Sequence, residues 1–162
     1  MGLSKRLEDE LVDIIHRIGM KAPLTKVYEA LATIEGVAGW WTEETSGDSK
    51  PGGTVQVLFR SPEGTEVGRM AFEMVEPKPN QSLRWRFLSG PPEWLGTEVT
   101  FELTRDGDQT LLVFGHRNWR EPVEFMAHCS MKWATFLLSL KQLTESGEGR
   151  PSPRDVKIDN WN

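Results

Sequence analysis

Apolar and polar residues alternate along much of the chain, in the two-residue period of β-strands with one buried face. In residues 11–20 the even-numbered positions form the apolar face: Val12, Ile14, Ile18 and Met20, with His16 among them. Five later runs alternate in the same way: 54–60, 67–77, 82–88, 97–108 and 109–119. The last two meet at an Asp-Gly pair, a strong hairpin signal. The pattern predicts an antiparallel sheet with one wet face, built from six or more strands.

Two segments have helical spacing instead. Between Pro23 and Gly36, apolar residues recur three and four positions apart, Pro23 fits the first helical position, and Gly36 ends the pattern. A longer helix is expected from Pro122 to Thr144, with Glu121 as its cap and "SGEGRPSP" as its stop. Its apolar stripe consists of Met126, Trp133, Leu137 and Leu140.

This order of elements predicts an α+β fold in which helices lie on one face of an antiparallel sheet. One long helix cannot cover so many twisted strands, so the sheet must curl around it and leave a cavity between them. A length of 162 residues fits one domain. We expect that domain to span residues 1–162, with a core over 11–145 and a tail over 146–162.

Composition narrows the class of protein. The net charge of −5, without a basic run, argues against a nucleic-acid partner. A lone cysteine, Cys129, permits no internal disulfide and fits a reducing compartment. No apolar run is long enough to cross a membrane, and charges stand where a signal peptide would be apolar. We therefore predict a cytoplasmic protein with no membrane partner.

Five short motifs occur in a specific order: "APLTKVYEAL", "WW" with a loop and "PGG", "VEPKPNQSLRWRF", "TLLVFGHRNW" and "KWATFLLSLKQL". Together, over about residues 13–144, they resemble the START-like (SRPBCC) superfamily, and more closely the family related to the C-terminal domain of activators of the Hsp90 ATPase. The resemblance implies a Bet v 1-like helix-grip fold: a curved antiparallel sheet around a long C-terminal helix, with short helices after the first strand. One departure is Lys132, which precedes Trp133 where the family often has glycine. We expect it to alter the pocket.

Relatives of this kind include carriers of apolar ligands, cyclases, dehydratases and chaperone regulators, so the resemblance alone does not decide the function. We favour binding of a small hydrophobic or aromatic ligand, lipids included, between the sheet and the long helix. The side chains expected to point inward predict the lining of this cavity. They are Trp41, Phe59, Met70, Phe72, Trp85, Phe101, Phe114, His116, Phe125, Cys129 and Trp133. The alternatives are a chaperone-regulator-like interaction module and a cyclase- or dehydratase-like enzyme. A chaperone or other protein and a homodimer stay open as partners.

The titratable residues give an enzyme little support. His116 shares the inward parity and is either a polar anchor or general base for a ligand, or a hydrogen-bonded structural histidine. His128 and Cys129 are adjacent on the long helix, so their side chains diverge and do not form a catalytic pair. Histidines and cysteines lack metal-ligand spacing. We therefore predict no catalytic residues, no metal and no cofactor.

The pair Trp40–Trp41 stands just before a polar, glycine-rich run. Both rings could belong to the core alone. The alternative is that one packs in the core while the other lines the entrance of the cavity, with Glu43 and Glu44 in water. We take the second interpretation, in which the pair seals the cavity at its mouth.

Overall fold

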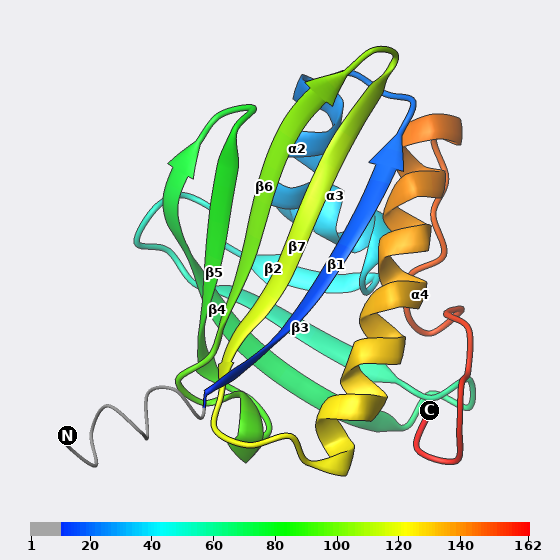
Figure 1. Cartoon of the computed structure of the whole chain (residues 1–162). Coiled ribbons are helices and arrows are strands. Elements are labelled where there is room, and N and C mark those ends of the chain that lie inside the picture. Colours follow the sequence, from blue (N-terminus) through cyan, green and yellow to red (C-terminus); the bar gives the residue numbers. More distant parts are fainter. Residues whose placement is uncertain (1–10) are drawn as a thin grey trace, which may run out of the picture.

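The computed structural model describes residues 11–162 and has the predicted helix-grip architecture (Figure 1). Seven antiparallel strands form one sheet in the order β1-β7-β6-β5-β4-β3-β2. The strands are β1 (Val12–Met20), β2 (Glu44–Gly47), β3 (Val55–Arg60), β4 (Glu66–Lys78), β5 (Ser82–Ser89), β6 (Glu98–Asp106) and β7 (Gln109–Trp119). The helices are α2 (Leu24–Ala32), α3 (Ile34–Trp40), α4 (Glu124–Ser146) and a short 3-10 turn, η1 (Pro92–Trp94).

The predicted strand parities are confirmed. On β3, for example, Val55, Val57 and Phe59 are buried while the residues between them are more exposed. The register sets inward side chains of neighbouring strands beside each other: Trp85 on β5 faces Met74 on one side and Val99 on the other. β2 lies in the run expected to be a loop. It is a polar edge strand that pairs with β3, so the apolar period that reveals a strand with a buried face is missing there.

The prediction of a single helix over residues 23–36 is wrong, because the chain forms two helices, α2 and α3, in this region. Thr33 has an extended backbone (φ −121°, ψ 153°), and its hydroxyl accepts a hydrogen bond from the Gly36 amide at 2.9 Å. Thr33 is therefore the N-cap of α3, a position that threonine commonly takes. Gly36 lies inside α3, where an added Cβ would come within 2.5 Å of Ala30 Cα. Glycine therefore lets the two helices pack closely, and the pattern does not end at it.

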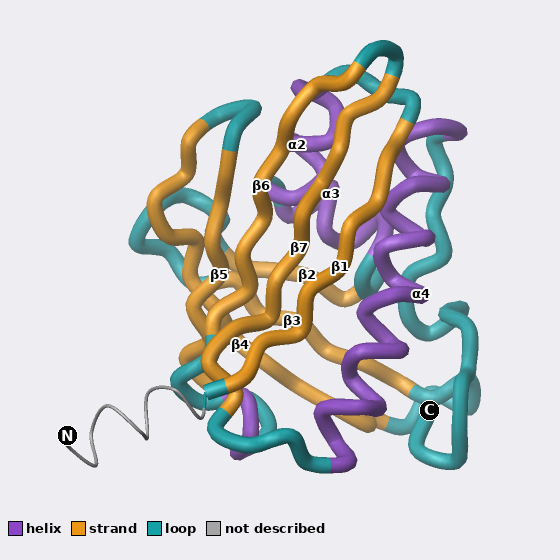
Figure 2. The backbone as a smooth tube through the Cα atoms, in the orientation of Figure 1, coloured by secondary structure: helices purple, strands orange, loops and turns teal. Residues whose placement is uncertain are grey.

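The long helix α4 begins two residues later than predicted, with Val123 as its N-cap, and ends at Ser146. Gly147 follows with φ 91°, a left-handed conformation that suits glycine at a helix end. All three α-helices lie on the concave side of the sheet, and strands β2–β4 bend across beneath α4 (Figure 2). The buried face of α4 includes Trp133, Leu137 and Leu140.

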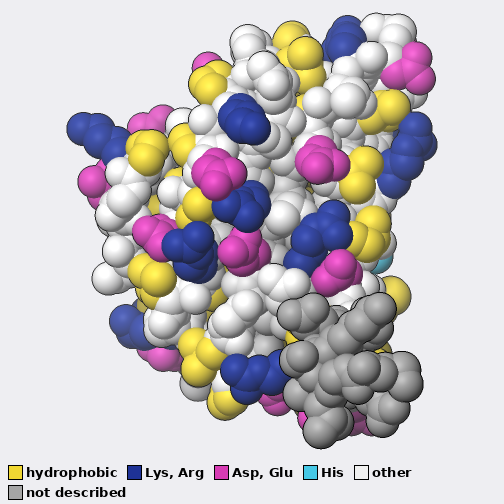
Figure 3. All heavy atoms as spheres, turned by 60° about the vertical axis from the view of Figure 1, so that its left-hand side comes forward, with side chains coloured by type: hydrophobic (Ala, Val, Ile, Leu, Met, Phe, Trp, Pro, Cys, Tyr) yellow, Lys and Arg dark blue, Asp and Glu magenta, His cyan; other side chains and the backbone are white. Residues whose placement is uncertain are grey.

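The opposite face of the sheet carries the alternating charges (Figure 3). Arg86 reaches Glu73 across strands at 3.1 Å, and Arg84 reaches Glu98 at 3.3 Å. Exposed pairs of this kind contribute little stability each, so this face is a solvated surface.

Within residues 11–162, no helix is long and apolar enough to span a membrane. The charges that argue against a signal peptide lie largely in residues 1–10, outside the described residues.

Truncation of Trp133 tests the helix–sheet packing. Trp133→Ala should lower the free energy of unfolding by about 3–5 kcal/mol, because it removes a buried indole from the core. Leu138→Ala on the exposed side of the same helix should change it by no more than about 0.5 kcal/mol. Urea melts measure both, and equal losses would mean that the buried and exposed faces of α4 are assigned wrongly.

Candidate functional site

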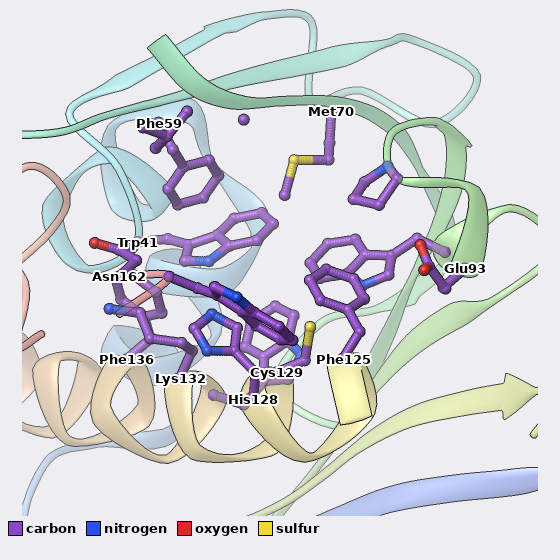
Figure 4. Close-up of a pocket in the computed structure, with 16 residues that line it drawn as sticks. Trp41, Phe59, Met70, Glu93, Phe125, His128, Cys129, Lys132, Phe136 and Asn162 are labelled. Atoms are coloured by element: carbon purple, nitrogen blue, oxygen red, sulfur yellow. The ribbon is translucent and has the colours of Figure 1, made fainter. Parts of the chain in front are cut away.

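A cavity of about 440 Å³ lies between α4 and the bent part of the sheet (Figure 4). Its sides come from β3 and β4, the β5–β6 connection, α4, the residue after α3 and the C-terminal segment. The residues that line it are Trp41, Phe59, Val67, Gly68, Met70, Pro91, Glu93, Trp94, Phe125, His128, Cys129, Lys132, Trp133, Phe136, Trp161 and Asn162. Most of these side chains are apolar or aromatic.

The two adjacent tryptophans have different places. Trp40 is fully buried, and its indole N–H donates to the Ala30 carbonyl at 2.8 Å, so it belongs to the core. Trp41 lines the cavity and stacks on Trp133 of α4, with ring centroids 5.1 Å apart. Since Trp41 is only 2% exposed, it is an inner wall of the cavity. The pair therefore does not close the mouth as expected.

Six of the eleven predicted lining residues border this cavity: Trp41, Phe59, Met70, Phe125, Cys129 and Trp133. The other five do not border it and are buried in the core: Phe72, Trp85, Phe101, Phe114 and His116. Parity assigns a side chain to the inner face of the sheet. It does not say which part of that face the helix leaves uncovered.

Several lining residues had no signal in the strand pattern. Phe136 shares the buried face of α4, but Trp94 lies in the "PPEW" turn and Trp161 in the aperiodic tail. The presence of Trp94 and Trp161 outside the predicted strands and helices was the one available hint that these segments reach the cavity.

His116 lies in a chain of hydrogen bonds that ends at the Trp94 carbonyl. The Trp133 indole N–H donates to His116 Nδ1 at 3.0 Å, so the proton of the neutral ring is on Nε2. Nε2 then donates to the Thr97 hydroxyl at 2.9 Å, which donates to the Trp94 carbonyl at 2.6 Å. Burial lowers the pKa of His116 to about 3. Both ring nitrogens are used internally, which favours the structural role over that of a ligand anchor or general base.

Cys129 and His128 do not form a nucleophilic pair. Burial raises the pKa of the Cys129 thiol to about 12, so the reactive thiolate is scarce at neutral pH. His128 Nδ1 is instead 2.7 Å from a carboxylate oxygen of Asp159. Among residues 11–162, no three histidine, cysteine or acidic side chains are grouped to hold a metal ion.

Lys132 lines the cavity but extends its ammonium group to the C-terminal segment. Nζ forms an ion pair with Asp155 and donates to the Val156 carbonyl at 2.8 Å. Burial opposes ionisation of Asp155, but hydrogen bonds from Lys132 and Lys157 outweigh it and lower its pKa. Lys132, which we expected to alter the pocket, thus lines it and is bonded to a carboxylate of the C-terminal segment.

The family model for "Activator of Hsp90 ATPase homolog 1-like protein" matches residues 21–145. The chain belongs to this family. A dimeric Aha1 from Colwellia psychrerythraea, solved in solution, is 41% identical, with 85% of this chain and 99% of that chain covered and a TM-score of 0.72. No curated protein matches the chain significantly.

More distant structures share the fold of this chain. CalU16 from Micromonospora echinospora is 22% identical, with 91% of this chain and 74% of that chain covered and a TM-score of 0.69. A Nitrosomonas europaea protein is 19% identical, with 84% of this chain and 95% of that chain covered and a TM-score of 0.69. At these identities the likeness extends to the fold alone.

The buried histidine predicts a specific pH dependence. Its folded pKa of about 3 lies below the ordinary value of 6.5, so protons bind preferentially to the unfolded chain. The contribution of His116 to stability is complete above pH 6.5 and is lost progressively as the pH falls toward 3. Between pH 7 and pH 5 it should amount to about 2 kcal/mol.

The measurement is the free energy of unfolding against pH for the wild type and His116→Gln. The variant should lack this component of the slope, whatever its stability at pH 7. Parallel curves would mean that His116 is not held neutral.

Proposed function

We propose that this protein binds a small apolar or aromatic molecule, lipids included, in the cavity between α4 and the sheet. The supporting observation is the cavity itself, whose volume of about 440 Å³ suits a small ligand. Stacked aromatic side chains such as Trp41 and Trp133 wall it and offer flat apolar surface.

The paired polar groups of the cavity disfavour an anionic ligand. Lys132 is bonded to Asp155, and His128 is bonded to Asp159. An anion would have to displace one of these carboxylates or lose its hydration without a new partner, which is costly in a buried site. A neutral ligand enters without disturbing either pair.

His116 and Cys129 give a catalytic role little support. General acid–base chemistry needs a titratable group near neutral pKa within reach of the reacting atom. Burial moves the pKa of both His116 and Cys129 far from neutrality, and His116 does not border the cavity. We therefore rank a cyclase- or dehydratase-like enzyme below a binding protein. The lone cysteine supports a cytoplasmic location for the protein.

The family description favours a second candidate, a chaperone-regulator-like module that acts as a homodimer. The 41% identical Colwellia protein is an Aha1 dimer. In this chain Ile15 on β1 and Met131 and Leu138 on α4 are large apolar side chains that are about half exposed. Sedimentation velocity tests the dimer, and the ATPase rate of an Hsp90-type chaperone with and without the protein tests the regulator. A monomer that leaves the ATPase rate unchanged would remove this candidate.

Filling the cavity tests the proposed binding. Gly68 has the inward parity of Met70, and an added Cβ would have one neighbour within 4 Å, Phe59 Cβ at 3.9 Å. Gly68→Leu should therefore occupy the cavity without a backbone clash. We expect it to lower the affinity for N-phenyl-1-naphthylamine at least about tenfold, with stability changed by no more than about 1 kcal/mol.

Ala71→Leu is the matched control, because it adds the same side chain to the same strand on the opposite parity. It should bind the probe like the wild type, by fluorescence titration and by thermal shift. Unchanged binding by Gly68→Leu would place the probe elsewhere, and equal losses in both variants would show an effect on the strand.

A further inference from the structure

The C-terminal segment returns along α4 and ends beside its first turns (Figure 1). We call residues 155–162 the strap. Trp161 and Asn162 of the strap line the cavity together with Trp41 (Figure 4). Trp161 also borders a second groove, which is lined by α4 and by residues 158–161. Trp161 therefore separates the cavity from this groove.

The strap is anchored at its first residue. The Asp155 side chain is 1% exposed and forms an ion pair with Lys132, whose side chain is 9% exposed. Lys157 also reaches Asp155, at 3.2 Å. Just before the strap, the Ser152 amide donates to the Trp41 carbonyl at 2.9 Å, which joins this segment to the cavity wall.

Asp159 holds the far part of the strap in place. One of its carboxylate oxygens lies 2.7 Å from His128 Nδ1, and the other accepts a hydrogen bond from the Trp161 amide at 2.8 Å. The Trp161 ring lies edge-on to His128, with centroids 5.3 Å apart, and 6.4 Å from Phe125. Trp161 is 48% exposed, so part of its ring has no protein neighbour.

The strap lies outside the family match, which ends at residue 145. Its anchor is the buried ion pair of Asp155 with Lys132, a residue of α4 that also lines the cavity. The anchor therefore holds the strap against the cavity wall.

We propose that Trp161 selects among ligands of the cavity, favouring those that place a planar aromatic ring at its mouth. The inference rests on the proposed ligand binding and adds a residue that determines specificity. A half-exposed indole beside Phe125 offers an aromatic ring an offset-stacked or edge-on partner, which is worth more than contact area alone. A saturated chain gains only the contact area. Asp159 acts as a positioning residue, through the Trp161 amide and His128.

The test compares two uncharged probes by isothermal titration calorimetry, N-phenyl-1-naphthylamine and 1-dodecanol. Trp161→Ala should weaken the aromatic probe about two- to tenfold and leave 1-dodecanol within about twofold. Trp161→Phe should retain most of the affinity for the aromatic probe. Leu138→Ala, at an exposed apolar side chain away from the cavity lining, is the control and should bind both probes like the wild type.

Asp159→Asn tests the positioning role by stopped-flow dissociation of the aromatic probe. It should release the probe several-fold faster than the wild type, and it should add nothing in the Trp161→Ala background, because coupled residues are not additive. Additive effects would separate Asp159 from Trp161. Thermal melts of these surface variants should stay close to the wild type.

The outcomes distinguish the two proposals. Wild-type binding with no change in Trp161→Ala, or with an equal loss for both probes, overturns the selective role of Trp161 and leaves the ligand site standing. A wild type that binds neither probe refutes the proposed function, and this inference with it.

Discussion

The stacking of Trp41 between the long helix and the sheet is the contact on which the rest of the structure depends. Its ring lies 5.1 Å from Trp133 on α4 and 5.2 Å from Trp85 on β5. Large flat rings in series keep the helix away from the sheet at this end of the molecule. The helix can bury its apolar stripe against the strands there only by leaving space beside the indoles, and that space is the cavity.

The hydrogen bonds around this stack explain why the interior is uncharged. Trp133 donates to His116, and His116 passes its other N–H to Thr97, so the histidine serves as a neutral spacer. The cationic end of Lys132 is directed out of the cavity to Asp155. His116, His128 and Lys132 thus have protein partners, and the proposed recognition rests mainly on apolar surface. These contacts support the proposed binding of a neutral molecule.

Much of the fold was predictable from the sequence, and the site only in part. Strands with one wet face leave a two-residue period, so β3 to β7 and the inward position of Phe59 and Met70 could be predicted. The polar edge strand β2 and the break at Thr33 leave no such period, because pairing and capping use backbone and hydroxyl groups. Trp161 could not be placed at all, since long-range bonds of Asp155 and Asp159 carry it to the cavity.

The central claim is that a small apolar molecule occupies the cavity beside Trp41 and Trp133. A crystal structure of the wild-type protein with N-phenyl-1-naphthylamine tests it most directly. The account predicts the probe inside the cavity, its rings against Trp41 and Trp133 and one edge near Trp161, with the Lys132–Asp155 pair intact. A probe bound only on the outer surface, with the cavity holding water, would contradict it.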